Sequence, residues 1–508
     1  MKSFVWIFWS LLPCVVAALP RGDIKMVPSQ VAIVDQTAWV NANQLLMFVG
    51  NNGSLAYDMG AHLGKNDGLY YPYVSLDDII NGYQTKTLMY SAGLWLGAID
   101  SASGDTLVAL SEYSTEFYPG QMINQTFDPN AADDPAVRVY RLFSDSLAGN
   151  PNYDYTVWPV SQAAPLDAGG NPEVIGDQTL WSVFNDACAG WHSNDAGGTL
   201  PLGVEVRQSA FAFNDYGELG VTVFIRYRFY NKGPNTLTGM RVALWADPDL
   251  GGSSDDLVGC DTNLSLGFAY NATNADAVYG STPPAVGVAL MQGPLTYTGN
   301  GADTAVAFGR RWIAYRNLGM TAFTKYQNGT DPNTYAESYD FMLGLLADGS
   351  PYMYNGDALT FMVSGSPNAG TGDLDFSPSD RRMMPSTGPF TMRPEDSAEI
   401  VFAIVVGQGA DRLSSVNILR ANTVTLREFF KQWYQPCCIG ITGNVDGDAE
   451  NIVDIADLML LIDYLFFSGQ LSICPEENNV DRLPSIDIGD LMTLIDYLFF
   501  SYDLPACP

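Results

Sequence analysis

The stretch LGVTVFIRYRFY, Leu219 to Tyr230, decides the fold class of this chain. Apolar side chains at alternate positions face one way, and mostly larger or charged ones face the other. The first set is Val221, Val223, Ile225, Tyr227 and Phe229, and the second is Thr222, Phe224, Arg226, Arg228 and Tyr230. A period of two is typical of a β-strand. The turn-rich sequence NKGPNT follows, and a second apolar run extends from Leu237 to Trp245, so we expect a β-hairpin.

The same alternation recurs from Val31 to Gly409 between turns rich in Gly, Asn, Asp and Pro. Further strands are expected over residues 46–48, 88–96, 106–113, 137–143, 204–213, 305–315 and 399–406. Many strands with few helices between them predict a mainly β protein with an antiparallel β-sandwich body. This body covers residues 19–435, as one domain or as two subdomains with a seam near 297–304.

Two helices are expected within the body. Asp331 is a candidate N-cap for the first, with Pro332 at its first position. The apolar stripe of this helix consists of Tyr335, Tyr339, Met342 and Leu346. The second helix is expected from about Asp411 to Trp433, packed on the last body strand. Its candidate buried residues are Leu413, Val416, Leu419 and Phe430.

The composition bounds the function. The chain has 508 residues, 47% of them hydrophobic, which is ample for large buried cores. It carries 24 Lys and Arg against 56 Asp and Glu, a formal charge of −32. Nucleic acid and anionic membrane surfaces would repel such a chain, so cations and neutral polymers such as polysaccharides are the more plausible ligands.

The N-terminus has the pattern of an export signal. Lys2 precedes an apolar run from Phe4 to Val16, and small residues follow at Ala17 and Ala18. We interpret residues 1–18 as a secretory signal peptide. A membrane anchor is the alternative, although the run is short for a bilayer span of about 20 residues. We expect no membrane span in the mature chain and an extracellular or cell-surface location.

The last seventy residues repeat one pattern. The second copy places Asn479, Asp481, Asp487 and Asp490 at positions 1, 3, 9 and 12 of a loop before an apolar helical run. This is the EF-hand spacing for calcium. The first copy has two extra residues in its loop, and its candidate ligands are Asn444, Asp446, Asp448, Asp454 and Asp457. We therefore expect a small helical, EF-hand-like module over residues 436–508, with helical runs at 458–467 and 491–500.

Four cysteines frame this module: Cys437, Cys438, Cys474 and Cys507. In an oxidising compartment they are expected to form two bridges that tie the end of each repeat back to the adjacent pair. Metal thiolates are the alternative. Cys188 and Cys260 in the body form a third bridge or remain buried as small apolar residues, and the sequence leaves both readings open.

One loop of the body is unusually acidic. The run WADPDLGGSSDDLVGCD, from Trp245 to Asp261, contains five carboxylates: Asp247, Asp249, Asp255, Asp256 and Asp261. Like charges this close repel unless a cation or solvent relieves them. A calcium site, a solvated acidic turn and a catalytic carboxylate pair are the three interpretations.

Catalytic signatures are scarce. The chain has only two histidines, His62 and His192, and neither lies in a recognisable motif. No nucleophile elbow, zinc-protease helix, phosphate loop or dinucleotide fingerprint is present. A sugar-stacking platform is conceivable from the aromatic residues, although such residues more often fill a sandwich core. The tryptophans considered for it are Trp95, Trp158, Trp181, Trp191 and Trp312. We expect no catalytic residue.

The doubled tail pattern resembles a type I dockerin, the module that docks secreted proteins onto scaffolds by binding cohesin domains. The resemblance covers about 443–502 and implies that the oxygen-bearing residues named above are calcium ligands. It also implies a cohesin-like or other surface scaffold protein as partner. Ile455-Ala456 and Ile488-Gly489 stand where dockerins of cellulose-degrading complexes usually carry a hydroxyl pair.

The body is similar to a group of large secreted bacterial proteins without an established function. The stretches that carry this likeness are SAGLWLGA (91–98), WADPDLG, DDLVGCD, LGMTAF (318–323) and DRRMMPSTGPFTM (380–392). The likeness implies a secreted, sheet-rich protein and no particular activity.

Together these features favour a secreted, calcium-binding modular protein whose β-rich body is displayed or assembled through the tail module. An extracellular glycoside hydrolase that acts in polysaccharide breakdown is the first alternative, since dockerin-bearing proteins are often such enzymes. A structural surface or matrix protein is the second.

Overall fold

The computed structural model of the chain describes most of the body and of the tail module. The described residues are 36–83, 86–131, 134–144, 152–167, 170–194, 196–433, 438, 441–448, 452–467, 469–471, 474–483, 486–500, 503–505 and 507. The expected signal peptide, residues 1–18, and Cys437 lie outside this set.

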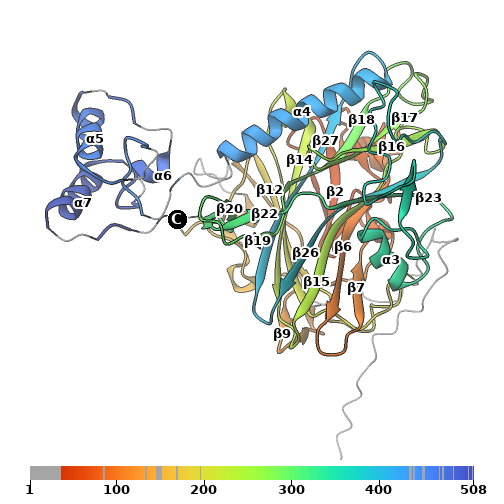
Figure 1. Cartoon of the computed structure of the whole chain (residues 1–508), viewed down its shortest axis with the longest axis horizontal. Coiled ribbons are helices and arrows are strands. Elements are labelled where there is room, and N and C mark those ends of the chain that lie inside the picture. Colours follow the sequence, from red (N-terminus) through yellow and green to blue (C-terminus); the bar gives the residue numbers. More distant parts are fainter. Residues whose placement is uncertain are drawn as a thin grey trace, which may run out of the picture.

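Two large antiparallel sheets form the body (Figure 1). The ten-stranded sheet contains β23 (Ala322–Gln327), β26 (Arg381–Met392), β15 (Leu237–Asp247), β6 (Ser91–Asp100), β3 (Ser54–Leu55), β2 (Leu46–Gly50), β4 (Leu69–Tyr70), β5 (Thr87–Met89), β1 (Thr37–Val40) and β7 (Thr106–Leu110). The nine-stranded sheet contains β11 (Tyr140–Phe143), β12 (Gln178–Asn185), β13 (Val204–Ala212), β14 (Thr222–Asn231), β27 (Ser397–Gly407), β18 (Ala285–Gln292), β17 (Leu266–Asn271), β16 (Asp256–Asp261) and β8 (Tyr118–Pro119). The mainly β, sandwich-type fold class is confirmed.

The principal core lies between the two sheets. Alternate side chains of both sheets meet there, among them Leu244 and Val242 of β15 and Ile225 and Val223 of β14, all fully buried. Strands before and after residues 297–304 contribute to this one core. Around that position the chain forms two small hairpins, β19 (Leu295–Tyr297) with β22 (Tyr315–Asn317) and β20 (Thr304–Ala307) with β21 (Arg310–Ile313). Two further small pairs are β9 (Met122–Ile123) with β10 (Thr126–Phe127) and β24 (Tyr352–Tyr354) with β25 (Asp357–Leu359).

The hairpin expected between 219–230 and 237–245 is wrong, although both strands exist. β14 pairs with β13 and β27 in the nine-stranded sheet, whereas β15 pairs with β6 and β26 in the ten-stranded sheet. Because β14 already has a neighbour on each side, it has no free edge for β15. The turn after Asn231 therefore carries the chain across the sandwich from one sheet to the other.

Helices cover the outer faces of the sheets. The body helices are α1 (Leu76–Ile80), α2 (Tyr153–Thr156), α3 (Tyr335–Met342) and α4 (Arg412–Trp433). α4 lies along the nine-stranded sheet (Figure 1), where its buried Val416, Leu419 and Phe430 join a second core. The helix predicted from Asp411 to Trp433, and its burial, are thus confirmed. The N-cap predicted for α3 is wrong, because Thr334 accepts the N–H of Glu337 in place of Asp331.

The tail module consists of α5 (Ile455–Phe467), α6 (Pro475–Asn478) and α7 (Ile488–Phe499), which lie together beyond the end of α4 in Figure 1. Leu458 and Leu461 of α5 pack with Leu491 and Leu494 of α7. A disulfide joins Cys438 to Cys507, as expected, and Cys474 is also disulfide-bonded. Cys188 and Cys260 are buried and carry no disulfide, so the third bridge is not formed.

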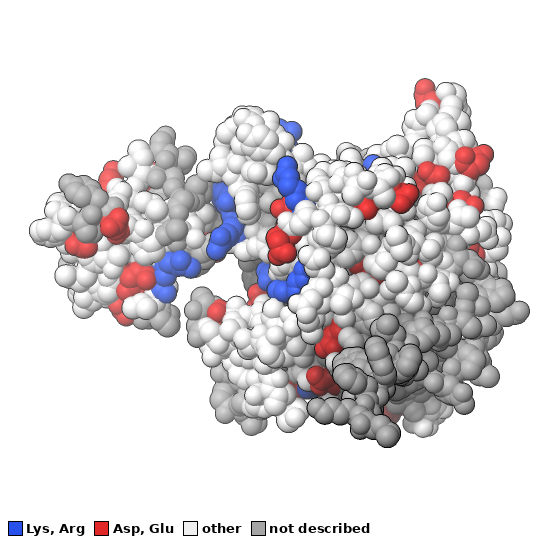
Figure 2. Space-filling model, turned by 90° about the horizontal axis from the view of Figure 1, so that it is seen from below, with Lys and Arg blue, Asp and Glu red and all other residues white. Residues whose placement is uncertain are grey.

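The surface reflects the acidic composition. On the face shown in Figure 2, acidic side chains are spread widely, whereas the basic ones gather in one region. Within the described parts of the chain, no helix is long and apolar enough to cross a membrane.

Candidate functional site

The first tail loop holds its candidate ligands in a defined network. The Asp457 carboxylate accepts the backbone N–H of Asp446 at 2.9 Å and that of Asp454 at 2.8 Å. The side-chain amide of Asn444 donates to the carbonyl of Asp448 at 3.0 Å, and the Asp448 N–H donates to Asp446 Oδ1 at 3.0 Å. The N–H of Ala456 donates to Asp454 Oδ1 at 2.6 Å. All five predicted positions therefore take part in one loop.

The second tail loop repeats these contacts position by position. The Asp490 carboxylate accepts the N–H groups of Asp481 at 3.1 Å and Asp487 at 2.8 Å. The side-chain amide of Asn479 donates to the carbonyl of Leu483 at 2.6 Å. The backbone N–H of Leu483 donates to Asp481 Oδ1 at 2.9 Å. The N–H of Gly489 donates to Asp487 Oδ1 at 2.7 Å. The two loops thus share five equivalent hydrogen bonds despite the two extra residues in the first.

Asp457 and Asp490, the last candidate ligands of the two loops, are both fully buried. Burial raises the pKa of Asp457, and nearby Asp446 and Asp454 raise it further against the lowering effect of the backbone N–H groups. Burial likewise raises the pKa of Asp490, with Asp481 acting in the same direction. A cation would relieve this cost of ionisation. Among the described residues, neither loop brings three carboxylates within 4.8 Å of one another.

The five carboxylates of the acidic body loop do not form one group. Asp247 and Asp249 meet Asp380, which comes from the loop before β26, and the three offer oxygens within 4.8 Å of one another. Asp255 and Asp256 lie beside Asn271, the last residue of β17. Asp261 pairs with Arg420 of α4 at 2.7 Å and belongs to neither group. A single calcium loop formed by all five is therefore not what the structure shows.

The group of Asp247, Asp249 and Asp380 lies beside tyrosines. Tyr113 donates its hydroxyl to Asp247 Oδ2 at 2.5 Å, and Arg382 lies 2.8 Å from Asp247 Oδ1 and also pairs with Asp380. Burial raises the pKa of Asp247 well above its usual range, opposed by Arg382. Burial together with Asp380 raises the pKa of Asp249 to about 7. The group therefore combines two carboxyls whose pKa is raised by burial, Asp247 and Asp249, with an arginine that pairs with Asp247 and Asp380.

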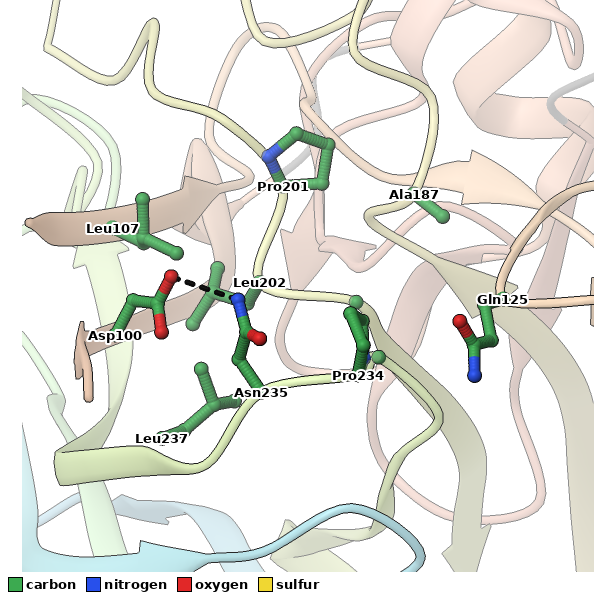
Figure 3. Close-up of a pocket in the computed structure, with 11 residues that line it drawn as sticks. Asp100, Leu107, Gln125, Ala187, Pro201, Leu202, Pro234, Asn235 and Leu237 are labelled. Atoms are coloured by element: carbon green, nitrogen blue, oxygen red, sulfur yellow. Dashed lines mark hydrogen bonds between the residues drawn. The ribbon is translucent and has the colours of Figure 1, made fainter. Parts of the chain in front are cut away.

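A separate small cavity lies at one end of the sandwich (Figure 3). Its volume is about 150 Å³, and loops and strand ends from different parts of the chain line it. Asn235 donates to Asp100 Oδ2 at 2.9 Å on one side, while Pro201 and Pro234 form apolar parts of the wall. Sequence reasoning missed this cavity, because its lining residues come from loops and strand ends far apart in the sequence and share no motif. It offers one carboxylate and no second acid.

The tryptophans considered for a sugar-stacking platform mostly belong to the core. Trp95, Trp158 and Trp181 are buried, and Trp95 stacks on Trp245. Trp312 is 38% exposed, and its ring lies 5.7 Å from that of Tyr315. The interpretation as core is thus confirmed for the three buried residues.

Comparison with known proteins gives no family. No family model matches the chain, and no curated protein matches it significantly. Among solved structures, a bacterial glucoamylase complexed with acarbose is similar at 9% identity and a TM-score of 0.25, over 83% of this chain and 38% of that one. A GH36 α-galactosidase, AgaA from Geobacillus stearothermophilus, in complex with stachyose, is similar at 9% identity and a TM-score of 0.29, over 76% and 42%. The chain spans about two-fifths of the length of these structures, and scores this low assign no function.

Proposed function

We propose that this chain is an exported, calcium-binding modular protein whose β-sandwich body is displayed or assembled through its tail module. The observation that carries the proposal is the set of five equivalent hydrogen bonds in the two tail loops. Each loop presents carboxylate and amide oxygens at alternate positions before a helix, which is the arrangement that suits a hard cation. The dockerin-like pattern of the sequence points to the same role.

Attachment is supported by the outward faces of the two tail helices. Apolar side chains at equivalent positions of the repeats are exposed to nearly the same extent. Ile455 and Ile488 are 59% and 58% exposed, and Met459 and Met492 are also 59% and 58% exposed. Exposed apolar residues grouped in this way mark interaction surfaces. The partner we propose is a protein domain of the cohesin-like or other scaffold type, with an apolar patch to match.

Calcium titration of the full chain, first stripped with a chelator, tests this function. Asp457→Ala and Asp490→Ala should each remove one bound ion, and the double variant two. Asp463→Ala with Asp496→Ala is the matched control, because these acids occupy equivalent, exposed helical positions outside the loops. If the double variant binds as many ions as the parent chain, the proposal fails.

Glycoside hydrolysis is the second candidate function, which the Asp247, Asp249 and Asp380 group favours. Two carboxyl groups about 5–5.5 Å apart serve retaining glycosidases, one as acid and one as nucleophile. Asp249, with its pKa of about 7, suits the acid, and Asp380 the nucleophile. Reducing-sugar release from a panel of soluble glycans should then fall at least about 100-fold in Asp249→Asn. Absence of any release by the parent chain would remove this candidate.

A further inference from the structure

Four polar side chains neighbour one another around Asn271, the last residue of β17. They are Asp255, Asp256, Asn271 and Asp276. Asp256 and Asn271 lie directly opposite each other in the antiparallel register of β16 and β17, so their side chains share one face of the sheet. Asn271 and Asp276 lie outside the acidic run of the sequence, which is why sequence reasoning missed them.

Oxygen atoms crowd around the amide nitrogen of Asn271. This Nδ2 atom lies 3.3 Å from Asp255 Oδ2, 3.5 Å from Asp276 Oδ2 and 3.5 Å from the carbonyl oxygen of Leu250. An amide NH₂ has two protons, and each of these contacts is at the long limit of a hydrogen bond. One nitrogen cannot satisfy all three acceptors, and the Gly252 N–H is shared between two of them, Asp276 Oδ2 at 3.1 Å and the Leu250 carbonyl at 3.0 Å.

Two further oxygens of the group have no hydrogen-bond partner among the described residues. Asp256 and Asn271 are both 0% exposed, and the Oδ1 atom of each is left without a donor. A buried polar atom without a partner is costly, and native structures rarely leave one. Asn271 carries no charge, so its unpaired oxygen is a second observation, separate from the clustering of acidic residues.

The carboxylates of this group have no positively charged partner. Two other buried carboxylates of the body do have one: Asp375 pairs with Lys325 and Arg381, and Glu399 pairs with Arg228. No Lys or Arg in the described parts of the chain pairs with Asp255, Asp256 or Asp276. Burial raises the pKa of Asp256 well above its usual range, and the charges of Asp249 and Asp255 add to the rise.

We propose that Asp255, Asp256, Asn271 and Asp276 bind a divalent cation, with calcium as the best match. Calcium takes six to eight oxygen ligands from carboxylates, amide oxygens and backbone carbonyls, and the carbonyl of Leu250 lies in the same place. The loop backbone fits closely around the group, since a Cβ on Gly251 would lie 2.3 Å from Asp276 Oδ1. A cation here would fasten the end of β15, in one sheet, to the edge of the other sheet.

The test uses the full chain carrying Asp457→Ala and Asp490→Ala, so that the tail loops do not contribute. Terbium replaces calcium, and its luminescence is excited through tyrosine. Tyr279 is a tyrosine in contact with the group, since its backbone N–H donates to Asp276 Oδ1 at 2.5 Å. We expect one remaining bound ion, displaced by excess calcium. Asp276→Asn should weaken its binding at least tenfold, while keeping Oδ1 as acceptor for the Val278 and Tyr279 N–H groups.

Asp261→Asn is the control, since Asp261 ends the same strand but pairs with Arg420. Asp255→Asn, at the half-buried edge of the group, decides the question if Asp276→Asn disturbs the circular dichroism spectrum. Unchanged terbium binding in both variants, or no binding in the tail-disabled chain, overturns the proposal. The number of ions lost on substituting Asp457 and Asp490 tests only the proposed calcium binding of the tail. Either proposal can therefore fail while the other holds.

Discussion

Cys438 and Cys507 are joined by a disulfide across 69 residues of sequence, with their Cα atoms 5.6 Å apart. The bridge closes a ring that contains both tail repeats. Because a crosslink stabilises a fold by limiting its unfolded chain, Cys438→Ser with Cys507→Ser should cost the module about 4 kcal/mol. Hydrogen exchange of the α5 and α7 amides measures this loss. Equal exchange in both forms would show that the ring adds nothing, and the α4 amides serve as internal control.

Asp249 should make the stability of the body depend on pH. Its pKa is about 7 in the fold and about 4 in an unfolded chain, so folding favours the protonated form. Its contribution to the free energy of unfolding is therefore complete below about pH 4 and is lost as the pH rises through 7. In chelator, the free energy of unfolding obtained from urea titrations should fall over this interval, by up to about 4 kcal/mol for this group. Asp249→Asn should flatten the fall, and Asp105→Asn, at an exposed site, should not.

The packing of α4 can be tested with two neighbouring residues. Leu419 is fully buried against the nine-stranded sheet, whereas Ile418 is 38% exposed. Leu419→Ala should lower the free energy of unfolding by about 2–5 kcal/mol, because it leaves a cavity. Ile418→Ala removes a similar volume and should cost less than about 1 kcal/mol. Similar losses in the two variants would mean that α4 does not hold to the sheet through this face.

The crossing from β14 to β15 depends on a close approach of two glycines. Gly203 has φ +80°, and a Cβ there would lie 2.8 Å from the Cα of Gly233 in the crossing turn. Gly104 has the same φ but open space around it. Gly104→Ala should therefore show the backbone strain alone, about 1 kcal/mol, and Gly203→Ala a clearly larger loss. Thermal unfolding of the two variants measures the difference, and equal shifts would contradict it.

The sequence predicts the elements of this chain better than their partners. Alternation gives β14 and β15 within a few residues, because period two is a local property. Whether they pair depends on which edges are free, and β27, more than 160 residues later, takes the edge that a hairpin would need. Strand pairing is also missed in the run 305–315, which is predicted as one strand. In the structure it forms β20 and β21, which pair with each other because Gly309 allows a tight turn between them.

The candidate sites follow the same rule. The tail loops were predictable, because their oxygens lie within a few consecutive residues before a helix. In the body, the sequence shows the acidic run 245–261, but it does not show that the five carboxylates of this run lie in three different places in the fold. Asp380 joins Asp247 and Asp249 from more than 120 residues away, and the sheet register alone brings Asn271 beside Asp256. Such contacts depend on strand pairing and not on local sequence.

The interleaving of the two sheets along the chain bears on how the protein is made. The nine-stranded sheet cannot be completed until β27 has been synthesised, because β27 joins β14 to β18 at its centre. Until then, β14 and β18 present unpaired edges, the kind of edge that invites aggregation. A nascent chain truncated before Ser397 should therefore depend on chaperones. The nine-stranded sheet should form only after β27, its last strand in the sequence, has been synthesised.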